Sequence, residues 1–373
     1  MISAKIPYQN YLALNILNNS NFISLTTYRG LWMKLISLFN HKGGVSKTTT
    51  TFNMGWMLAE QGFKTLIVDA DPQCNLTALV LGYSTTDDFD TVYANNPNSD
   101  IYTCIKPVVD GSLGKVVPAD PILTSNPNLS LLCGNIALSE IETQIGVALT
   151  TSAAIPAIRN IPGSIGAFLK ETAIRHKFDY VLIDMSPSVG ALNQCLLMSS
   201  DYFIVPTSPD FFCAQAIKSL AKVLPRWNLD IQSFRDNSII YPFPACPPKF
   251  LGFISQKYRP RNNMPVKSFQ KWIDIIKGEV KDTLLPALQP VNMSITAEEF
   301  MAGAKSAEPF NLSNIADFNS LIAQSQKHST PVFALTDDQI EQSGVILETM
   351  KANRKDFRDN FSALANSVVQ LAI

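Results

Sequence analysis

The chain has 373 residues, 46% of them hydrophobic and 16% charged, which is enough to bury a large core and excludes disorder over most of its length. Its formal net charge of -1 excludes a general attraction to nucleic acid or to an acidic membrane, so any polyanion must bind a local patch. No stretch reaches the roughly 18 uninterrupted apolar residues of a membrane span, and the N-terminus lacks a signal-peptide pattern. Since the six cysteines form no Cys-x-x-Cys pair, we expect free thiols in a cytoplasmic protein.

Residues 1–32 show no clear hydrophobic period and precede Met33, a candidate natural start. We expect them to be an N-terminal extension that is either not native or poorly ordered. A strand at 34–39 then leads into a glycine-rich turn, and a helix at 47–61 ends before Gly62, as is common after a last helical turn. Apolar runs typical of buried parallel strands recur at 65–69, 129–133, 180–184, 202–205 and 250–254, with helical stretches at 165–176 and 214–227.

Strands and helices that alternate at this spacing predict an α/β fold. We expect a mostly parallel, doubly wound sheet with helices on both faces, in one domain over 33–373. A variable, partly basic region covers 225–330 and C-terminal helices cover 337–372. The stretch 84–100 is rich in Asp, Asn, Thr and Ser and predicts a surface loop.

The glycine-rich turn between the first strand and the first helix has the context of a phosphate site, because backbone N–H groups there point at an anion. Lys47 would reach the β- and γ-phosphates, and the Thr48 hydroxyl would bind Mg²⁺. The ordinary pattern G-x-x-x-x-G-K-[ST] fails, since His41 and Ser46 replace its two glycines. The expected nucleotide-contacting residues are Lys42, Gly43, Gly44, Val45, Ser46, Lys47, Thr48 and Thr49.

The pattern K-G-G-x-x-K-[ST]-T does fit this turn. With it the chain resembles the ParA/MinD family of deviant Walker A P-loop ATPases, and among them the ParA-type partition ATPases. The resemblance implies ATP and Mg²⁺ as cofactors. It also implies that Lys42 reaches across an ATP-bound homodimer to the partner's phosphates. Ser46 departs from the family's glycine, which puts nucleotide affinity and turnover in question.

Two aspartate motifs follow in the family's order. The run Asp69-Ala70-Asp71-Pro72-Gln73-Cys74-Asn75 resembles the family's D-x-D-P-Q-x-N at a strand end. The resemblance assigns to Asp71 the orientation or deprotonation of the attacking water, and to Asp69 the support of the metal's water shell. Asp184 follows an apolar strand in the Walker B arrangement and would hold Mg²⁺ through water. Ser186 stands where the family has a proline, which predicts a less rigid loop.

Two segments are candidates for partner surfaces. The stretch 249–281 holds eight basic and two acidic residues, a local charge of +6, and its candidate DNA contacts are Lys257, Arg259, Arg261, Lys267 and Lys271. A solvated helix face with a basic loop explains the same charges nearly as well. The C-terminal helix presents Phe357, Phe361, Leu364, Val368 and Leu371 on one face. MinD-like proteins bind membranes through such a helix, but packing on the sheet is the favoured interpretation.

The leading hypothesis is a dimerising switch with slow, Mg²⁺-dependent ATP hydrolysis that a protein partner stimulates. It would bind DNA non-specifically in plasmid or chromosome partition or in cargo positioning, which implies association with the nucleoid. An alternative is a nucleotide-gated regulator of a partner effector, as in a mobile-element or defence operon. A MinD-like membrane-associated ATPase is less favoured. The metal-cluster reductase branch is least favoured, since it needs a cysteine soon after Asp184 that this sequence lacks.

Overall fold

A computed structural model of the chain describes residues 33–373, except 83–85, 112–114, 152–154, 156–157, 262–263 and 305–307. The side chains of residues 86–88, 260, 261 and 264 also lie outside the description. The expected extension at 1–32 falls outside the described residues. Within the described part, no helix is both long and apolar enough to cross a membrane.

One sheet organises the described residues, with strand order β10-β7-β6-β1-β5-β2-β4-β3. Each neighbouring pair runs parallel except β3 and β4. All six residues of β2 and all six of β5 are buried, as expected of parallel strands covered on both faces. The strands are β1 (Lys34–Leu38), β2 (Thr65–Ala70), β3 (Ile122–Leu123), β4 (Leu129–Leu132), β5 (Tyr180–Met185), β6 (Tyr202–Thr207), β7 (Lys249–Tyr258) and β10 (Asn311–Ala316).

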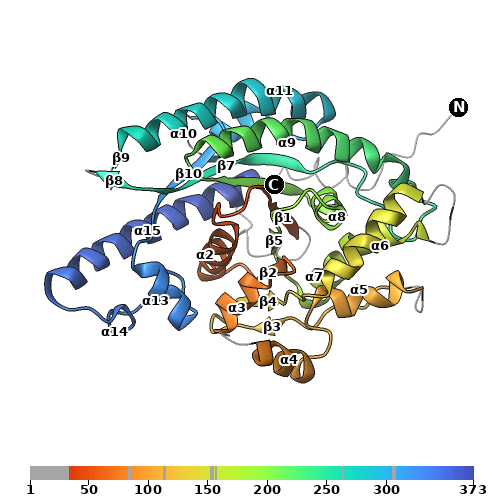
Figure 1. The fold of residues 1–373 in the computed structure, drawn as a ribbon, viewed down its shortest axis with the longest axis horizontal. Helices are drawn as coiled ribbons and strands as arrows, with labels where there is room; N and C mark the ends of the chain where they lie inside the picture. Colours follow the sequence, from red (N-terminus) through yellow and green to blue (C-terminus); the bar gives the residue numbers. More distant parts are fainter. Residues whose placement is uncertain are drawn as a thin grey trace, which may run out of the picture. The chain divides into compact units, whose positions relative to one another are not determined.

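Helices cover both faces of this sheet, which confirms the predicted α/β fold. Figure 1 shows α9 and α10 over one face and α2 with α15 over the other. A short antiparallel pair, β8 (Pro260–Arg261) and β9 (Met264–Pro265), precedes α10. The helices are α2 (Lys47–Glu60), α3 (Asn75–Leu81), α4 (Thr86–Asn95), α5 (Ile101–Val109), α6 (Leu138–Thr151), α7 (Ile161–His176), α8 (Ala191–Ser199), α9 (Phe211–Asp230), α10 (Lys267–Glu279), α11 (Leu285–Leu288), α12 (Ala297–Ala304), α13 (Leu321–His328), α14 (Asp337–Ile340) and α15 (Gly344–Leu371).

The stretch 84–100 is not the surface loop that its polar composition predicts, because residues 86–95 form α4. Val92 of this helix is buried, and the hydroxyl of Tyr93 donates a hydrogen bond to the carbonyl of Gly134. Phe89 packs its ring against Tyr93. These three side chains have the i, i+3, i+4 spacing of one helical face, so an apolar period hidden among polar residues outweighs composition here.

The C-terminal helix α15 packs on the protein and does not present a free apolar face. The five apolar residues singled out in the sequence, Phe357, Phe361, Leu364, Val368 and Leu371, are all buried. Arg358 pairs with Glu60 of α2 at 2.7 Å, and the amide of Gln61 donates to Asn366 at 3.2 Å. The last helix is thus anchored to the first one, as the favoured interpretation of the sequence predicted.

Helix α2 lies unusually close to the sheet at Gly55. A Cβ atom added there would lie 2.5 Å from the Cγ2 atom of Ile67 in β2. A larger side chain at residue 55 would require Ile67 or the helix itself to shift. Because α2 starts at the glycine-rich turn, this close packing fixes the position of the turn relative to the strand ends.

Candidate functional site

The glycine-rich turn lies between the end of β1 and the start of α2, where strand ends and a helix N-terminus meet. Asn40 secures it, since its amide donates to the carbonyl of Pro206 in β6 at 2.9 Å and its side-chain oxygen accepts from the Lys42 amide at 3.0 Å. Gly44 and Ser46 have φ angles of 75° and 58°. Ser46 therefore holds a left-handed conformation that costs a residue with a Cβ and that glycine adopts freely.

Lys47 is only 7% exposed, and its ammonium points back into the turn. The Nζ atom donates to the carbonyl oxygens of Asn40 and Lys42, at 2.8 and 3.3 Å. Burial lowers the pKa of Lys47, and the negative charges of Asp184 and Asp71 act in the opposite direction. A buried ammonium that carbonyl dipoles hold beside two carboxylates suits an anionic ligand in the turn.

Asp69 and Asp184 are opposite each other in the pairing of β2 with β5, and both are buried. One oxygen of Asp69 accepts from the amide and from the hydroxyl of Thr77, both at 2.7 Å. Its other oxygen accepts from the Asp71 amide at 3.3 Å. Burial raises the pKa of Asp69 to about 6, although these hydrogen bonds oppose the shift. Asp69 is thus engaged in holding α3 and the Asp71 backbone, and its support of a metal's water shell stays a prediction.

Asp184 accepts the fewest hydrogen bonds of the three aspartates Asp69, Asp71 and Asp184. Within the described residues, neither of its buried carboxylate oxygens makes a hydrogen bond of good geometry. Burial and then the charge of Asp69 raise its pKa well above the usual range, while the Thr48 hydroxyl and the Lys47 ammonium act in the opposite direction. A bare buried carboxylate is costly, and a hard divalent cation with its waters supplies what these oxygens lack. Thr48 and Asp184 therefore fit Mg²⁺ by the chemistry of their donors.

A cavity of about 350 Å³ opens over the turn. Asp71 lines it at the end of β2, with one carboxylate oxygen accepting from the Gln73 amide at 3.0 Å. The other lining residues are Gly43, Gly44, Val45, Ser46, Lys47, Thr48, Thr49, Asn75, Leu79, Pro187, Lys257 and Gln326. The structure thus brings seven of the eight expected nucleotide-contacting residues together with Asp71. It also brings Lys257, which the sequence suggested as a DNA contact.

Lys42 is the expected residue that does not line this cavity. Its ammonium pairs with the carboxylate of Asp210 at 3.2 Å. Asp210 also accepts from the Cys213 amide at 2.8 Å and so caps the start of α9. From sequence, Asp210 had no role of its own within the family-like segment 205–212, since an acidic residue before a helix usually serves only as a cap.

The loop after Asp184 is held in place by one side chain, although Ser186 stands where the family has a proline. The Asn193 amide lies 2.9 Å from the Ser186 carbonyl and 3.0 Å from the Ser188 carbonyl. It also reaches the hydroxyls of both serines, at 3.0 and 3.1 Å. Side-chain hydrogen bonds thus hold this loop, and its lower rigidity relative to a loop with proline stays a prediction.

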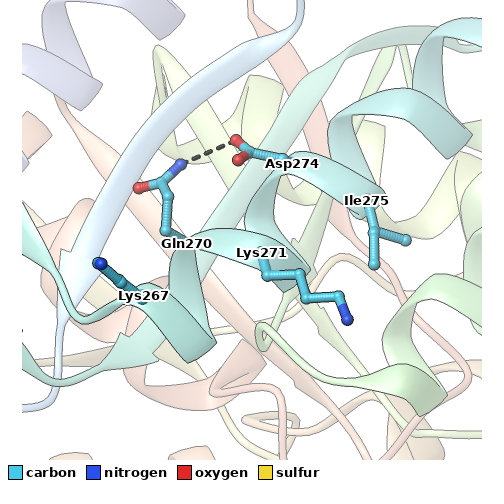
Figure 2. Close-up of a pocket in the computed structure, with 5 residues that line it drawn as sticks. All are labelled: Lys267, Gln270, Lys271, Asp274 and Ile275. Atoms are coloured by element: carbon cyan, nitrogen blue, oxygen red, sulfur yellow. Dashed lines mark hydrogen bonds between the residues drawn. The ribbon is translucent and has the colours of Figure 1, made fainter.

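Among the candidate DNA contacts, Lys267 and Lys271 line one cavity and Lys257 lines others. Lys267 and Lys271 of α10 line a shallow surface cavity of about 560 Å³ together with Gln270, Asp274 and Ile275 (Figure 2). Gln270 donates to Asp274 at 2.8 Å, and neither lysine forms an ion pair within the described residues. Lys257 instead lies at the glycine-rich turn. Arg259 is exposed, and the side chain of Arg261 is not among those described.

A phosphate-type loop at the end of a parallel strand, with carboxylates at the ends of two neighbouring strands, defines a P-loop nucleotide-binding fold. A family model described as an AAA domain matches residues 33–233, which is more than half of the chain. The chain belongs to the ParA/MinD family of P-loop ATPases.

The chain is similar to curated relatives and, in its fold, to solved structures. The chain is 30% identical to the chromosome partitioning protein ParA of Caulobacter vibrioides over 199 residues, which are 52% of this chain and 63% of that protein. It is 26% identical to an uncharacterised protein of Methanocaldococcus jannaschii over 284 residues, 76% of this chain and 94% of that protein. The structure of a Cyanothece McdA–ATP complex matches with a TM-score of 0.56 at 17% identity, covering 90% of this chain and 96% of that one, and supports the fold.

Proposed function

We propose that this protein is a Mg²⁺-dependent ATPase that dimerises with ATP bound and binds DNA non-specifically, as a partition or cargo-positioning switch. One observation carries the nucleotide part of the proposal. The glycine-rich turn and the buried Lys47 line one cavity, and the negative charge of Asp184 acts on the Lys47 ammonium. A nucleoside triphosphate with its metal would suit the turn, the ammonium and the buried Asp184 carboxylate together. Residues 33–373 would form this ATPase domain, with the variable region at 225–330 and the helices at 337–372 as parts of it.

Hydrolysis at such a site needs mainly positioning and charge neutralisation. The backbone N–H groups from Gly43 to Thr49 would hold the phosphate oxygens. Lys47 would exchange its two carbonyl partners for the β- and γ-phosphates. Asp71 lines the same cavity and would orient the attacking water or accept its proton. The cation, held by Thr48 and through water by Asp184, would supply positive charge where negative charge develops.

Dimerisation would engage Lys42. In the structure its ammonium is paired with Asp210 of the same chain, at the rim of the site. A partly exposed ion pair is weak enough to exchange for a partner's phosphates, since such pairs contribute about 0–1 kcal/mol. Exposed apolar side chains in the loop after β5 and at the start of α9, Val189 and Phe212, suit the burial that a dimer requires.

DNA binding would use the α10 surface shown in Figure 2. Lys267 and Lys271 are exposed and project from one helical face, and each phosphate that a lysine neutralises adds a salt-sensitive increment of affinity. Two copies of the surface on a dimer would make retention on DNA depend on ATP. On this proposal the ATP-bound form resides on the nucleoid, and a protein partner stimulates hydrolysis and releases it.

Two alternatives differ in what the switch acts on. A nucleotide-gated regulator of a partner effector needs the same ATP site and dimer but no DNA surface, so gene neighbours encoding a toxin or nuclease would favour it. A MinD-like membrane role has less support, because the apolar face of α15 is buried in the protein. Neither alternative assigns a partner to Lys267 and Lys271, which form no ion pair within the described residues.

The deciding experiment measures oligomeric mass with ATP and Mg²⁺, with ADP, and without nucleotide, together with DNA retention across a salt series. Wild-type protein should dimerise only with ATP, and Lys47→Ala should remain monomeric because it cannot bind nucleotide. Asp71→Ala should bind ATP and stay dimeric while hydrolysis falls. A nucleotide-independent oligomer would contradict the switch.

The DNA surface has its own matched control. The double variant Lys267→Gln, Lys271→Gln should reduce the logarithmic salt slope of DNA binding by about two per protomer. The control Lys222→Gln, Lys355→Gln removes two exposed lysines from α9 and α15 and should leave the slope unchanged. If both double variants show the same salt slope of DNA binding, α10 is not part of a DNA surface, and the alternative of a nucleotide-gated regulator is favoured.

A further inference from the structure

Lys257 occupies a strained position at the end of β7. In the pairing of β7 with β10, Ile315 is opposite Gln256 and Ala316 is opposite Tyr258, so Lys257 is an extra residue that has no partner in the ladder. Its φ angle is 61°, a left-handed conformation that lysine rarely adopts and that asparagine or glycine adopts more readily. Such bulges are frequent beside active sites, where they redirect a side chain. The position of Lys257 therefore suggests that the side chain is kept for what it reaches.

The redirected side chain reaches the phosphate loop. The Nζ atom of Lys257 donates to the carbonyl oxygen of Gly44 at 2.9 Å. The side chain is exposed, and within the described residues no carboxylate forms an ion pair with it. A positive charge held at the loop by a single neutral acceptor is available to an anion that enters the site.

Lys257 also lies at the boundary of two cavities. The first, of about 350 Å³, contains the phosphate loop and Asp71. The second, of about 360 Å³, has Phe318 and Ile322 in its wall and one carboxylate, Asp317. Lys257 lines both cavities, together with Ser46, Thr49 and Gln326.

The two cavities differ in the chemistry they suit. Backbone N–H groups and Lys47 make the first a phosphate site, whereas an apolar wall with a single acceptor suits a nucleoside in the second. A nucleotide that spans both would pass Lys257 where its nucleoside joins its phosphates. The phosphate at that junction is the α-phosphate, which ATP and ADP share.

We propose that Lys257 is a nucleotide-binding residue that contacts the α-phosphate, exchanging its hydrogen bond with the Gly44 carbonyl for one with a phosphate oxygen. This inference rests on the nucleotide binding proposed above and deepens it, adding a third lysine to Lys42 and Lys47. It also removes Lys257 from the candidate DNA surface, because a bound nucleotide would occupy its ammonium.

The test measures the dissociation constants of ATP, ADP and adenosine by calorimetry with Mg²⁺ present, and the melting temperature without nucleotide. Lys257→Met should weaken ATP and ADP about ten-fold, by a similar factor for each, as expected for the loss of a charge-assisted hydrogen bond. Adenosine binding should be unaffected. Lys257→Arg keeps the charge and should retain most of the affinity, and Lys222→Met serves as the exposed-lysine control.

Lys257→Asn separates a binding role from a structural one. Asparagine tolerates the left-handed backbone, so this variant should keep or raise the melting temperature while losing affinity for ATP and ADP by a factor similar to that of Lys257→Met. Unchanged affinities in both variants, a loss confined to ATP, or a loss that accompanies a lower melting temperature in Lys257→Asn would each overturn the proposal. If wild-type protein binds no nucleotide at all, the proposed function fails, whereas normal wild-type binding with insensitive variants refutes only the role of Lys257.

Discussion

Replacing Ser46 by glycine should stabilise the protein, although Ser46 is part of the candidate nucleotide site. Its φ of 58° places it in the left-handed region, which costs a residue with a Cβ about 1–2 kcal/mol. Its hydroxyl makes no capping hydrogen bond to α2, so nothing is lost with the side chain. Glycine gives back about 0.5–1 kcal/mol through the greater freedom of the unfolded chain. The net expectation is a gain of roughly 0.5–1 kcal/mol, or about 1 °C in melting temperature for a chain of this size.

The assay is thermal unfolding without nucleotide, with urea unfolding as a second measure. Ser46→Ala is the matched control, because alanine also removes the hydroxyl but keeps the Cβ that causes the strain. Ser46→Gly should therefore exceed both wild type and Ser46→Ala in stability. An equal gain in the two variants would show that backbone strain at Ser46 is not the cause, and a loss in Ser46→Gly would refute the reasoning altogether.

Two further predictions concern helix packing and buried charge. Gly55→Ala should destabilise the protein by about 1–3 kcal/mol in urea unfolding, because the added Cβ meets Ile67. Gly278→Ala in α10 places its Cβ in open space and should stabilise the protein by about 0.5–1 kcal/mol. A change in unfolding free energy of the same sign for both variants would contradict the packing argument. Burial raises the pKa of Asp69 to about 6, above its unfolded value, so the folded state binds an extra proton between about pH 4 and 6. Without Mg²⁺ and nucleotide, the contribution of Asp69 to the free energy of unfolding should fall as the pH rises through this window. The variant Asp69→Asn should therefore show a flatter dependence of unfolding free energy on pH than wild type. Parallel curves for the two proteins would rule out this titration of Asp69.

The parts of the fold that the sequence predicts well are those with a strong local signal. Continuous apolar runs such as 180–184 and 202–205 mark buried parallel strands, and the structure has β5 and β6 there. Strand β10 (Asn311–Ala316) escaped prediction because its sequence is half polar, and it extends the sheet by pairing with β7. Helix α4 was missed for a related reason, since only three apolar side chains define its buried face.

The residues of the candidate site also differ in how strongly the local sequence predicts them. The run from Lys42 to Thr49 and the strand-end aspartates can be found from sequence, because phosphate and metal chemistry dictate both residue type and spacing. The contacts of Asp210 and Asn193 cannot, since each acts across a tertiary contact with no fixed spacing. Charge counting grouped Lys257 with the candidate DNA contacts, and the structure shows its ammonium at the Gly44 carbonyl. The sequence does not predict this contact, because a bulge that redirects a side chain leaves no mark on composition.

The contact between the first helix and the last has a consequence for how the protein is made. Arg358 of α15 pairs with Glu60 of α2 across a separation of 298 residues. At about 5–20 residues per second, a ribosome needs roughly 15–60 s to cover that distance. During that interval the face of α2 that α15 will cover stays bare on the nascent chain, next to a phosphate loop whose strands are already emerging. The packing of α15 on α2 therefore waits until α15 has been synthesised, and a chaperone that binds apolar surface would meet the domain before that step.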